Sequence, residues 1–189
     1  DRPRFRAGIL SGAGGSWIEN IIHKKKPLPV KGFAELLLGL ATDPYKLHPH
    51  DPMLSMFQWA AEPADPPAYG RQVLSEPREG APRHVLMLQG IVDHYILPSI
   101  ANATSLSFGL DLGGASLDAK TPEIASFTPL EQLLRFSGRA PLTLPISGNV
   151  KGAKGEVSTA VVVQHGEDGI EDGHEAAFQL AAPKHQYRC

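Results

Sequence analysis

The sequence predicts an α/β fold with a mostly parallel sheet and helices on both of its faces. Short apolar runs alternate along the chain with segments of helical character, which is the order expected of parallel strands joined by helices. Within these runs apolar and polar residues do not alternate, which is typical of strands that are covered on both faces. The chain contains 19 glycines and 17 prolines in 189 residues, which indicates many short elements joined by turns.

Four runs are expected to form strands: residues 7–11, 85–89, 142–146 and 157–164. The last of them contains three consecutive valines, whose branched side chains favour an extended backbone.

Helices are expected over residues 33–40, 52–61, 98–108, 130–136 and 175–182. Pro98 supports the third helix, because the N–H that proline lacks would be unpaired at a first helical position. Pro183 is expected to end the last helix. The proline-rich stretches 61–83 and 115–129 are expected to be surface excursions.

Composition and charge exclude several classes of protein. The chain is 42% hydrophobic and 20% charged, which fits a globular protein and excludes a coiled coil or a disordered chain. Its 18 basic and 20 acidic side chains do not fit a nucleic-acid binder, and the one basic run, residues 24–26, is interpreted as a solvated loop. No membrane span is expected, because every apolar run is far shorter than the roughly 20 residues required.

The two ends of the sequence suggest a fragment or a processed chain. The sequence begins at Asp1 without methionine and without the apolar core of a signal peptide. The only cysteine, Cys189, excludes an internal disulfide and a cysteine-rich metal site. The compartment stays open; an extracytoplasmic or secreted location is slightly favoured, because Cys189 permits pairing with an upstream cysteine.

Asp93 is the first candidate site residue. It follows a run, 84–90, that is interpreted as a buried strand ending at Gly90, and it precedes the helix that begins at Pro98. Side chains just beyond the carboxyl ends of strands line the ligand crevice in open α/β sheets. We therefore expect Asp93 to be a functional carboxylate, and the alternative is that it caps a loop or a helix.

His174 is the second candidate. It follows the valine-rich strand and a polar loop, and it comes immediately before the last predicted helix. An aspartate and a histidine that follow two strands of one sheet can converge at the same edge, where a buried carboxylate orients an imidazole base. The alternative is an ordinary surface histidine. His94 is given no catalytic role, because its side chain is expected to point away from the pair.

These segments together resemble the C-terminal half of an α/β-hydrolase. Residues 90–93 (Gly-Ile-Val-Asp) with Leu97-Pro98 are similar to the acid loop of that family, and residues 172–175 (Asp-Gly-His-Glu) are similar to its histidine loop. Residues 6–15 look like the strand that follows the nucleophile helix, and residues 17–83 look like a cap or lid insertion.

The resemblance implies a single, partial α/β-hydrolase-like domain over residues 1–189, with a helical cap at 16–83 and a second insertion at 107–156. It further implies a serine-type carboxylic ester hydrolase, similar to esterases and lipases, that needs no cofactor and no metal. Asp93 would be the acid of its catalytic triad and His174 the general base, acting on a small-molecule or lipid ester.

One departure from the family is expected to matter. No Gly-x-Ser-x-Gly turn occurs, and in residues 8–12 (Gly-Ile-Leu-Ser-Gly) the serine is fourth rather than third. The resemblance therefore implies that the nucleophile and the oxyanion-hole donors lie in a missing N-terminal segment, upstream of Asp1.

Competing sites are less well supported by the residue pattern. Four side chains could be interpreted as metal ligands: His165, Asp168, Asp172 and His174. The loop that contains them does not match a calcium-binding loop. Gly12, Gly14 and Gly15 do not form a dinucleotide-binding loop, because the third glycine of the Gly-x-Gly-x-x-Gly spacing is missing. The apolar residues between Met53 and Trp59 are interpreted as cap core, with an acyl pocket as the alternative.

Two functions other than an esterase remain open. One is a non-catalytic binding protein on a hydrolase-like fold, and the other is a peptidase of the same fold. A strand, a Gly-x-Ser-x-Gly turn and a helix immediately before Asp1 would favour the enzyme.

Overall fold

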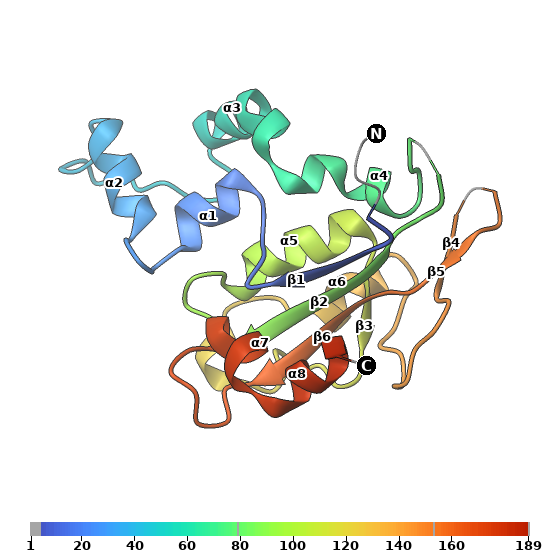
Figure 1. The fold of residues 1–189 in the computed structure, drawn as a ribbon. Helices are drawn as coiled ribbons and strands as arrows, with labels where there is room; N and C mark the ends of the chain where they lie inside the picture. The colour runs from blue at the N-terminus through green and yellow to red at the C-terminus, as the bar shows by residue number, and fades with distance from the viewer. Residues whose placement is uncertain (1–4, 79, 153, 189) are drawn as a thin grey trace.

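A four-stranded parallel sheet lies at the centre of the molecule (Figure 1). The computed structural model describes residues 5–78, 80–152 and 154–188, so Cys189 lies outside the described residues. The strands lie in the order β1, β2, β6, β3, and every neighbouring pair is parallel. Their bounds are β1 Ala7–Ser11, β2 His84–Ile91, β6 Ala160–Gly166 and β3 Asp111–Gly113. The predicted α/β class is therefore confirmed.

The register of the sheet brings the loops after β2 and β6 to the same edge. Leu88 of β2 pairs with Ser11 of β1 on one side and with Val163 of β6 on the other. Both inner strands continue beyond this row, to Ile91 and Gly166, and they end side by side. Because all four strands run in one direction, the segments that follow them emerge together.

Helices surround the sheet. In Figure 1, α5 (Pro98–Phe108) and α6 (Leu130–Arg135) lie behind the sheet, and α7 (Ala176–Gln179) and α8 (Ala181–Arg188) lie in front of it. The main hydrophobic core joins side chains of β2, β3, β6, α5 and α6; its central members are Val85, Met87, Leu112, Leu134 and Val162. Successive strand residues face opposite sides of the sheet, and helices cover both sides, so the inner strands are apolar at nearly every position.

Local sequence signals set the ends of the principal helices. Asp51 caps α3 (Pro52–Ala61) by accepting a hydrogen bond from the N–H of Met53 at 2.8 Å, and Pro52 occupies the first turn. The helix α5 begins at Pro98 and ends at Phe108, and the following cap residue, Gly109, has a φ of 75°, the left-handed conformation that glycine adopts without strain.

Four short helices lie between β1 and β2 in the chain, in segment 16–83. They are α1 (Trp17–His23), α2 (Val30–Leu37), α3 and α4 (Gly70–Val73), with the 3-10 turns η1 (Glu62–Ala64) and η2 (Pro66–Tyr69) between α3 and α4. Figure 1 shows α1, α2 and α3 grouped beside the sheet on the side of β1. No helix in the described parts of the chain is long and apolar enough to cross a membrane.

The predicted strand over 142–146 is wrong, and β3 takes its place in the sheet. Leu142 forms only an isolated bridge with Gly113. Pro141 precedes this run and Pro145 lies within it, and neither has an N–H to give to a ladder, which explains why pairing stops there. β3 lies within residues 107–156, the segment expected to be an insertion. The same segment contains the short elements η3 (Pro122–Ile124) and β4 (Val150–Lys151), and β4 pairs with β5 (Val157–Ser158).

Other predicted boundaries also change. The run 157–164 divides into β5 and β6, the helix predicted over 33–40 is α2, which ends at Leu37, and α1 was not predicted. The last predicted helix is broken at Leu180, whose backbone is extended. Pro183 does not end a helix; it lies in the first turn of α8, where its missing N–H leaves no partner unpaired.

Candidate active site

Asp93 is held rigidly at the end of β2. Its Oδ1 accepts hydrogen bonds from the backbone N–H groups of Tyr95 at 2.7 Å and Ile96 at 2.8 Å. Only 4% of its side chain is exposed. Asp93 therefore caps the loop that follows β2, as the alternative interpretation of this residue expected. The cap uses only Oδ1 and leaves Oδ2 for another partner.

That partner is His174. It lies in η4 (Gly173–Glu175), and its Nδ1 is 3.0 Å from Oδ2 of Asp93. The ring of Tyr95 covers it with a centroid distance of 4.8 Å and an angle of 32° between the planes. With Nδ1–H donating to the carboxylate, Nε2 is an acceptor. No side chain of the described residues hydrogen-bonds to this Nε2, and the His174 side chain is 32% exposed.

The imidazole reaches back across the sheet to the end of β1. A Cβ atom placed on Gly12 would lie 2.5 Å from Cε1 and 2.8 Å from Nδ1 of His174, so only glycine fits against this ring. Gly12 also has a φ of 53°, which disfavours larger residues. A Cβ atom placed on Gly14 would lie 2.6 Å from Cγ2 of Ile100 and 2.7 Å from Cγ2 of Ile96. The glycines of this loop therefore allow the backbone after β1 to pack closely against the segments that carry Asp93 and His174.

The two loops that carry Asp93 and His174 contact each other backbone to backbone. The N–H of Gly173 donates to the carbonyl of Val92 at 2.8 Å. A Cβ atom on Gly90 would overlap the carbonyl group of Gly173, and a Cβ atom on Gly173 would lie 2.5 Å from the carbonyl oxygen of Val92. Glycine at both positions is thus what allows the two loops to approach.

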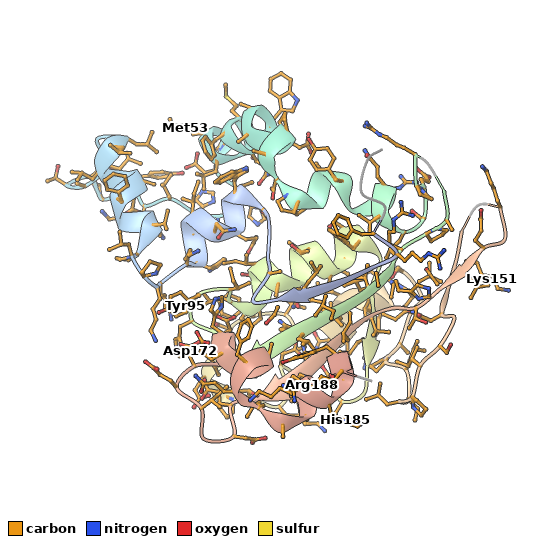
Figure 2. The ribbon with its side chains drawn as sticks, in the orientation of Figure 1. Met53, Tyr95, Lys151, Asp172, His185 and Arg188 are labelled. Carbon is orange, nitrogen blue, oxygen red and sulfur yellow. The ribbon has the colours of Figure 1, made fainter. Side chains whose placement is uncertain are left out.

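Asp172, which belongs to the segment similar to a histidine loop and to the possible metal set, is a third buried residue at this site. Its Oδ1 accepts from the backbone N–H groups of His94 and His174, both at 3.1 Å. Its Oδ2 lies 3.0 Å from Nζ of Lys26 and 3.0 Å from Nδ1 of His94. The signal was present in its spacing, because an aspartate two residues before His174 is placed to cap η4. Figure 2 shows Asp172 and Tyr95 at the same end of the sheet.

The environment of Asp172 favours its charged form. Burial acts to raise the pKa of this carboxyl, but the hydrogen bonds from the N–H of His174, the Lys26 ammonium and His94 outweigh it and leave the pKa below its ordinary value. The hydrogen bond with Asp172 in turn raises the pKa of Lys26, in spite of some desolvation. Both groups are therefore charged at neutral pH.

Residues 24–26 lie in an irregular segment, as interpreted from the sequence, and the Lys26 side chain is 48% exposed, but Lys26 also makes specific contacts with the site. Besides its ion pair with Asp172, its backbone N–H donates to the carbonyl of His94 at 3.3 Å, and its Nζ lies 5.6 Å from the centroid of the Tyr95 ring. Segment 16–83 is thereby tied to both site loops. His94 makes no hydrogen bond to Asp93 or His174 and contacts Asp172 instead.

The four side chains considered as metal ligands do not form a set. Nε2 of His165 lies 3.1 Å from Oε1 of Gln186, and burial lowers the pKa of His165 in spite of this hydrogen bond. His174 is engaged with Asp93, and Asp172 with Lys26 and His94. In the parts of the chain that the structure describes, no group of three or more His, Cys, Asp or Glu side chains is arranged to hold a metal ion.

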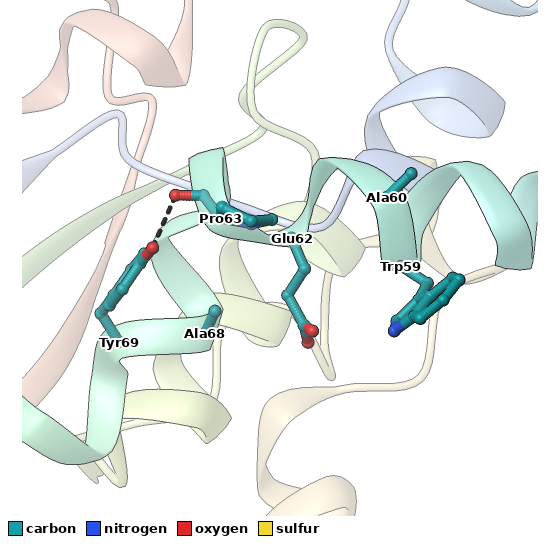
Figure 3. A pocket seen from close by; sticks show the side chains of 6 residues that line it. All are labelled: Trp59, Ala60, Glu62, Pro63, Ala68 and Tyr69. Atoms are coloured by element: carbon teal, nitrogen blue, oxygen red, sulfur yellow. Dashed lines mark hydrogen bonds between the residues drawn. The ribbon is translucent and has the colours of Figure 1, made fainter.

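A separate surface hollow lies at the junction of α3, η1 and η2 (Figure 3). It has a volume of about 570 Å³, and Trp59, Glu62 and Tyr69 contribute to its lining. The Tyr69 hydroxyl donates to the carbonyl of Pro63 at 2.6 Å. None of its lining side chains hydrogen-bonds with Asp93 or His174, so this hollow is distinct from the aspartate–histidine pair.

Comparison with known proteins adds no relative: no family model, curated protein or solved structure matches this chain. Because no relative is found, the class of this protein is described from its fold and its site alone. It is an α/β protein with an aspartate–histidine pair at the carboxyl edge of a parallel sheet.

Replacing Asp172 by alanine is expected to lower the free energy of unfolding by about 2–3 kcal/mol at neutral pH, because two backbone N–H groups and Lys26 lose their acceptor. Since the pKa of Asp172 is lowered in the folded state, its contribution is present above the ordinary carboxyl pKa of about 3.9 and is lost as the pH falls through the lowered value. Urea unfolding of both proteins at about pH 7 and about pH 3 measures this.

The exposed neighbour Glu171 provides the matched control, and Glu171→Ala is expected to have little effect. A difference between wild type and Asp172→Ala that stays constant down to low pH would contradict the ionised role of Asp172.

Proposed function

We propose that this chain carries the acid and the base of a serine-type carboxylic ester hydrolase, similar to esterases and lipases of the α/β-hydrolase superfamily. The observation that carries the proposal is the contact of 3.0 Å between Asp93 and Nδ1 of His174, with Nε2 left available. The parallel sheet and the position of each residue after its strand are compatible with that superfamily.

In the proposed reaction, Nε2 of His174 accepts the proton of a serine hydroxyl as its oxygen attacks the ester carbonyl carbon. Nε2–H then gives that proton to the leaving alcohol, and the same nitrogen activates the water that hydrolyses the acyl-enzyme. Asp93 holds Nδ1–H, which fixes the tautomer and stabilises the imidazolium. The two backbone N–H groups that bind Oδ1 keep the carboxylate oriented during this cycle.

The proposed nucleophile is a serine in a segment that precedes Asp1. The proposal is supported by β1, which in the described residues pairs only with β2 and whose Ile9 is 53% exposed. The imidazole of His174 lies at the carboxyl end of this outermost strand, beside Gly12. A further parallel strand along β1 would end next to Nε2, so that a serine in the turn after it would meet the base.

Labelling with a fluorophosphonate tests the proposal. In the natural gene product that contains this chain, we expect a covalent adduct on a serine upstream of Asp1, located by mass spectrometry of the modified peptide. The adduct should be lost in His174→Ala, because the serine is then no longer activated.

Three other outcomes would overturn the assignment. No adduct on a folded gene product would favour a non-catalytic binding protein. An adduct on Ser11, the hydroxyl residue next to Gly12, would place the nucleophile inside this chain and exclude the upstream position. Turnover of peptide substrates in preference to esters would identify a peptidase of the same fold.

A further inference from the structure

The helices α1, α2 and α3 enclose an apolar groove of about 610 Å³, which we call the α1–α3 groove. It is distinct from the aspartate–histidine pair and from the hollow at Trp59. Met53, which lines it, lies on α3, away from Tyr95 and Asp172 (Figure 2). Its lining side chains are mostly aliphatic and aromatic: Trp17, Ile21, Val30, Phe33, Leu37 and Phe57 are among them.

Several of these side chains are left in contact with water. Phe33 is 62% exposed, Leu37 is 70% exposed and Met53 is 52% exposed. Covering such apolar side chains removes them from water and is favourable. The volume of the groove lies within the range of about 300–1,000 Å³ of small-molecule sites, which are mostly apolar with a few polar groups. The groove therefore has the size and lining of a site for an apolar chain.

Among the described residues that line the groove, the polar ones are Asn20 and Lys24, and Lys24 is a cation. Asn20 uses its side-chain N–H to donate to the carbonyl of Ser16 at 3.0 Å. Lys24 lies at the end of α1 and forms no ion pair with any carboxylate of the described residues, in contrast to Lys26 with Asp172 and Lys46 with Glu35. An apolar groove that holds a single uncompensated ammonium is complementary to a molecule with one alkyl chain and one negative charge.

We propose that the α1–α3 groove binds one molecule of an anionic single-chain amphiphile, such as a fatty carboxylate. The alkyl chain covers Phe33, Leu37 and Phe57, and the carboxylate pairs with Lys24. The site does not use Asp93 or His174, so it stands or falls independently of the proposed hydrolase activity.

The position of Trp17 allows a direct test. Trp17 lines the groove, whereas Trp59 lines the separate hollow. The bromine of 11-bromoundecanoate quenches a tryptophan that it contacts, so the natural gene product is titrated with this probe below its micelle concentration. We expect saturable quenching that persists in Trp59→Phe and disappears in Trp17→Phe.

Charge variants test the role of Lys24. Lys24→Glu is expected to weaken binding by about tenfold or more, because it places a carboxylate beside the probe's carboxylate. Lys25→Glu is the matched control, since Lys25 is the adjacent, exposed residue and does not line the groove. The trimethylammonium analogue of the probe should bind more weakly to wild type. Leu37→Gln, at an exposed position that folding tolerates, should also reduce affinity.

Each contrary outcome overturns the proposal. Absence of saturable quenching excludes the site. Equal effects of Lys24→Glu and Lys25→Glu, or equal binding of the anionic and cationic probes, exclude recognition by Lys24. Quenching that requires vesicles or micelles, with none for the monomeric probe, would indicate attachment to a lipid surface in place of a single bound molecule.

Discussion

Replacing His174 by alanine in the natural gene product is expected to lower kcat for ester hydrolysis by about 10⁴-fold or more, which is the scale of loss when a member of a catalytic triad is removed. The reason is that no other imidazole of the described site faces the position of Nε2: His94 is engaged by Asp172. The loss is measured with a soluble chromogenic ester at saturating concentration.

The fold should survive this substitution. The His174 side chain is 32% exposed and accepts no backbone hydrogen bond, so far-UV circular dichroism and the unfolding midpoint are expected to change little. His50→Ala, at an exposed histidine far from Asp93 in the sequence, provides the matched control and should keep full activity. Wild-type turnover in His174→Ala would exclude this residue as the base.

Replacing Gly90 by alanine is expected to have the largest effect on stability, with a loss of about 3 kcal/mol or more in the free energy of unfolding. The new Cβ would overlap the backbone carbonyl of Gly173, and backbone cannot move aside as a flexible side chain can. Since Gly173 carries the neighbouring His174, the same change should also separate the histidine from Asp93. Urea unfolding monitored by tryptophan fluorescence measures the stability.

Gly8→Ala is the matched control for this prediction. Gly8 lies in β1, and a Cβ atom there would have no atom within 4 Å, so the substitution should be close to neutral. Equal stability of the two variants would contradict the close backbone contact between the aspartate and histidine loops.

The α/β class and the pair of site residues were predictable because their signals are local. The run of valines before His165 and the apolar run before Gly90 encode buried parallel strands, and parallel strands end at a common edge. Asp93, which follows the apolar run, and His174, which follows the run of valines, can therefore be expected to converge without knowledge of packing. The 3.0 Å contact between Asp93 and His174 agrees with that expectation.

Other features depend on partners that are distant in the chain. The strand at 111–113 has only three residues and no distinctive pattern, and it is defined by pairing with β6. The run 142–146 had the better strand composition, but Pro141 before it and Pro145 within it limit it to an isolated bridge. Lys26 belonged to a run that resembled an exposed basic loop, and its ion pair depends on the way segment 16–83 folds back onto Asp172.

The sequence by itself determined the class of fold, the two strands that precede Asp93 and His174, and the expectation that these two residues lie at one edge of the sheet, because apolar patterning and strand–loop order are properties of neighbouring residues. Only the tertiary structure decided that Gly12, Gly90 and Gly173 are the points of closest approach, that Asp172 joins three segments, and that the α1–α3 groove is open. These features are set by distances between residues far apart in the chain, which no local pattern encodes.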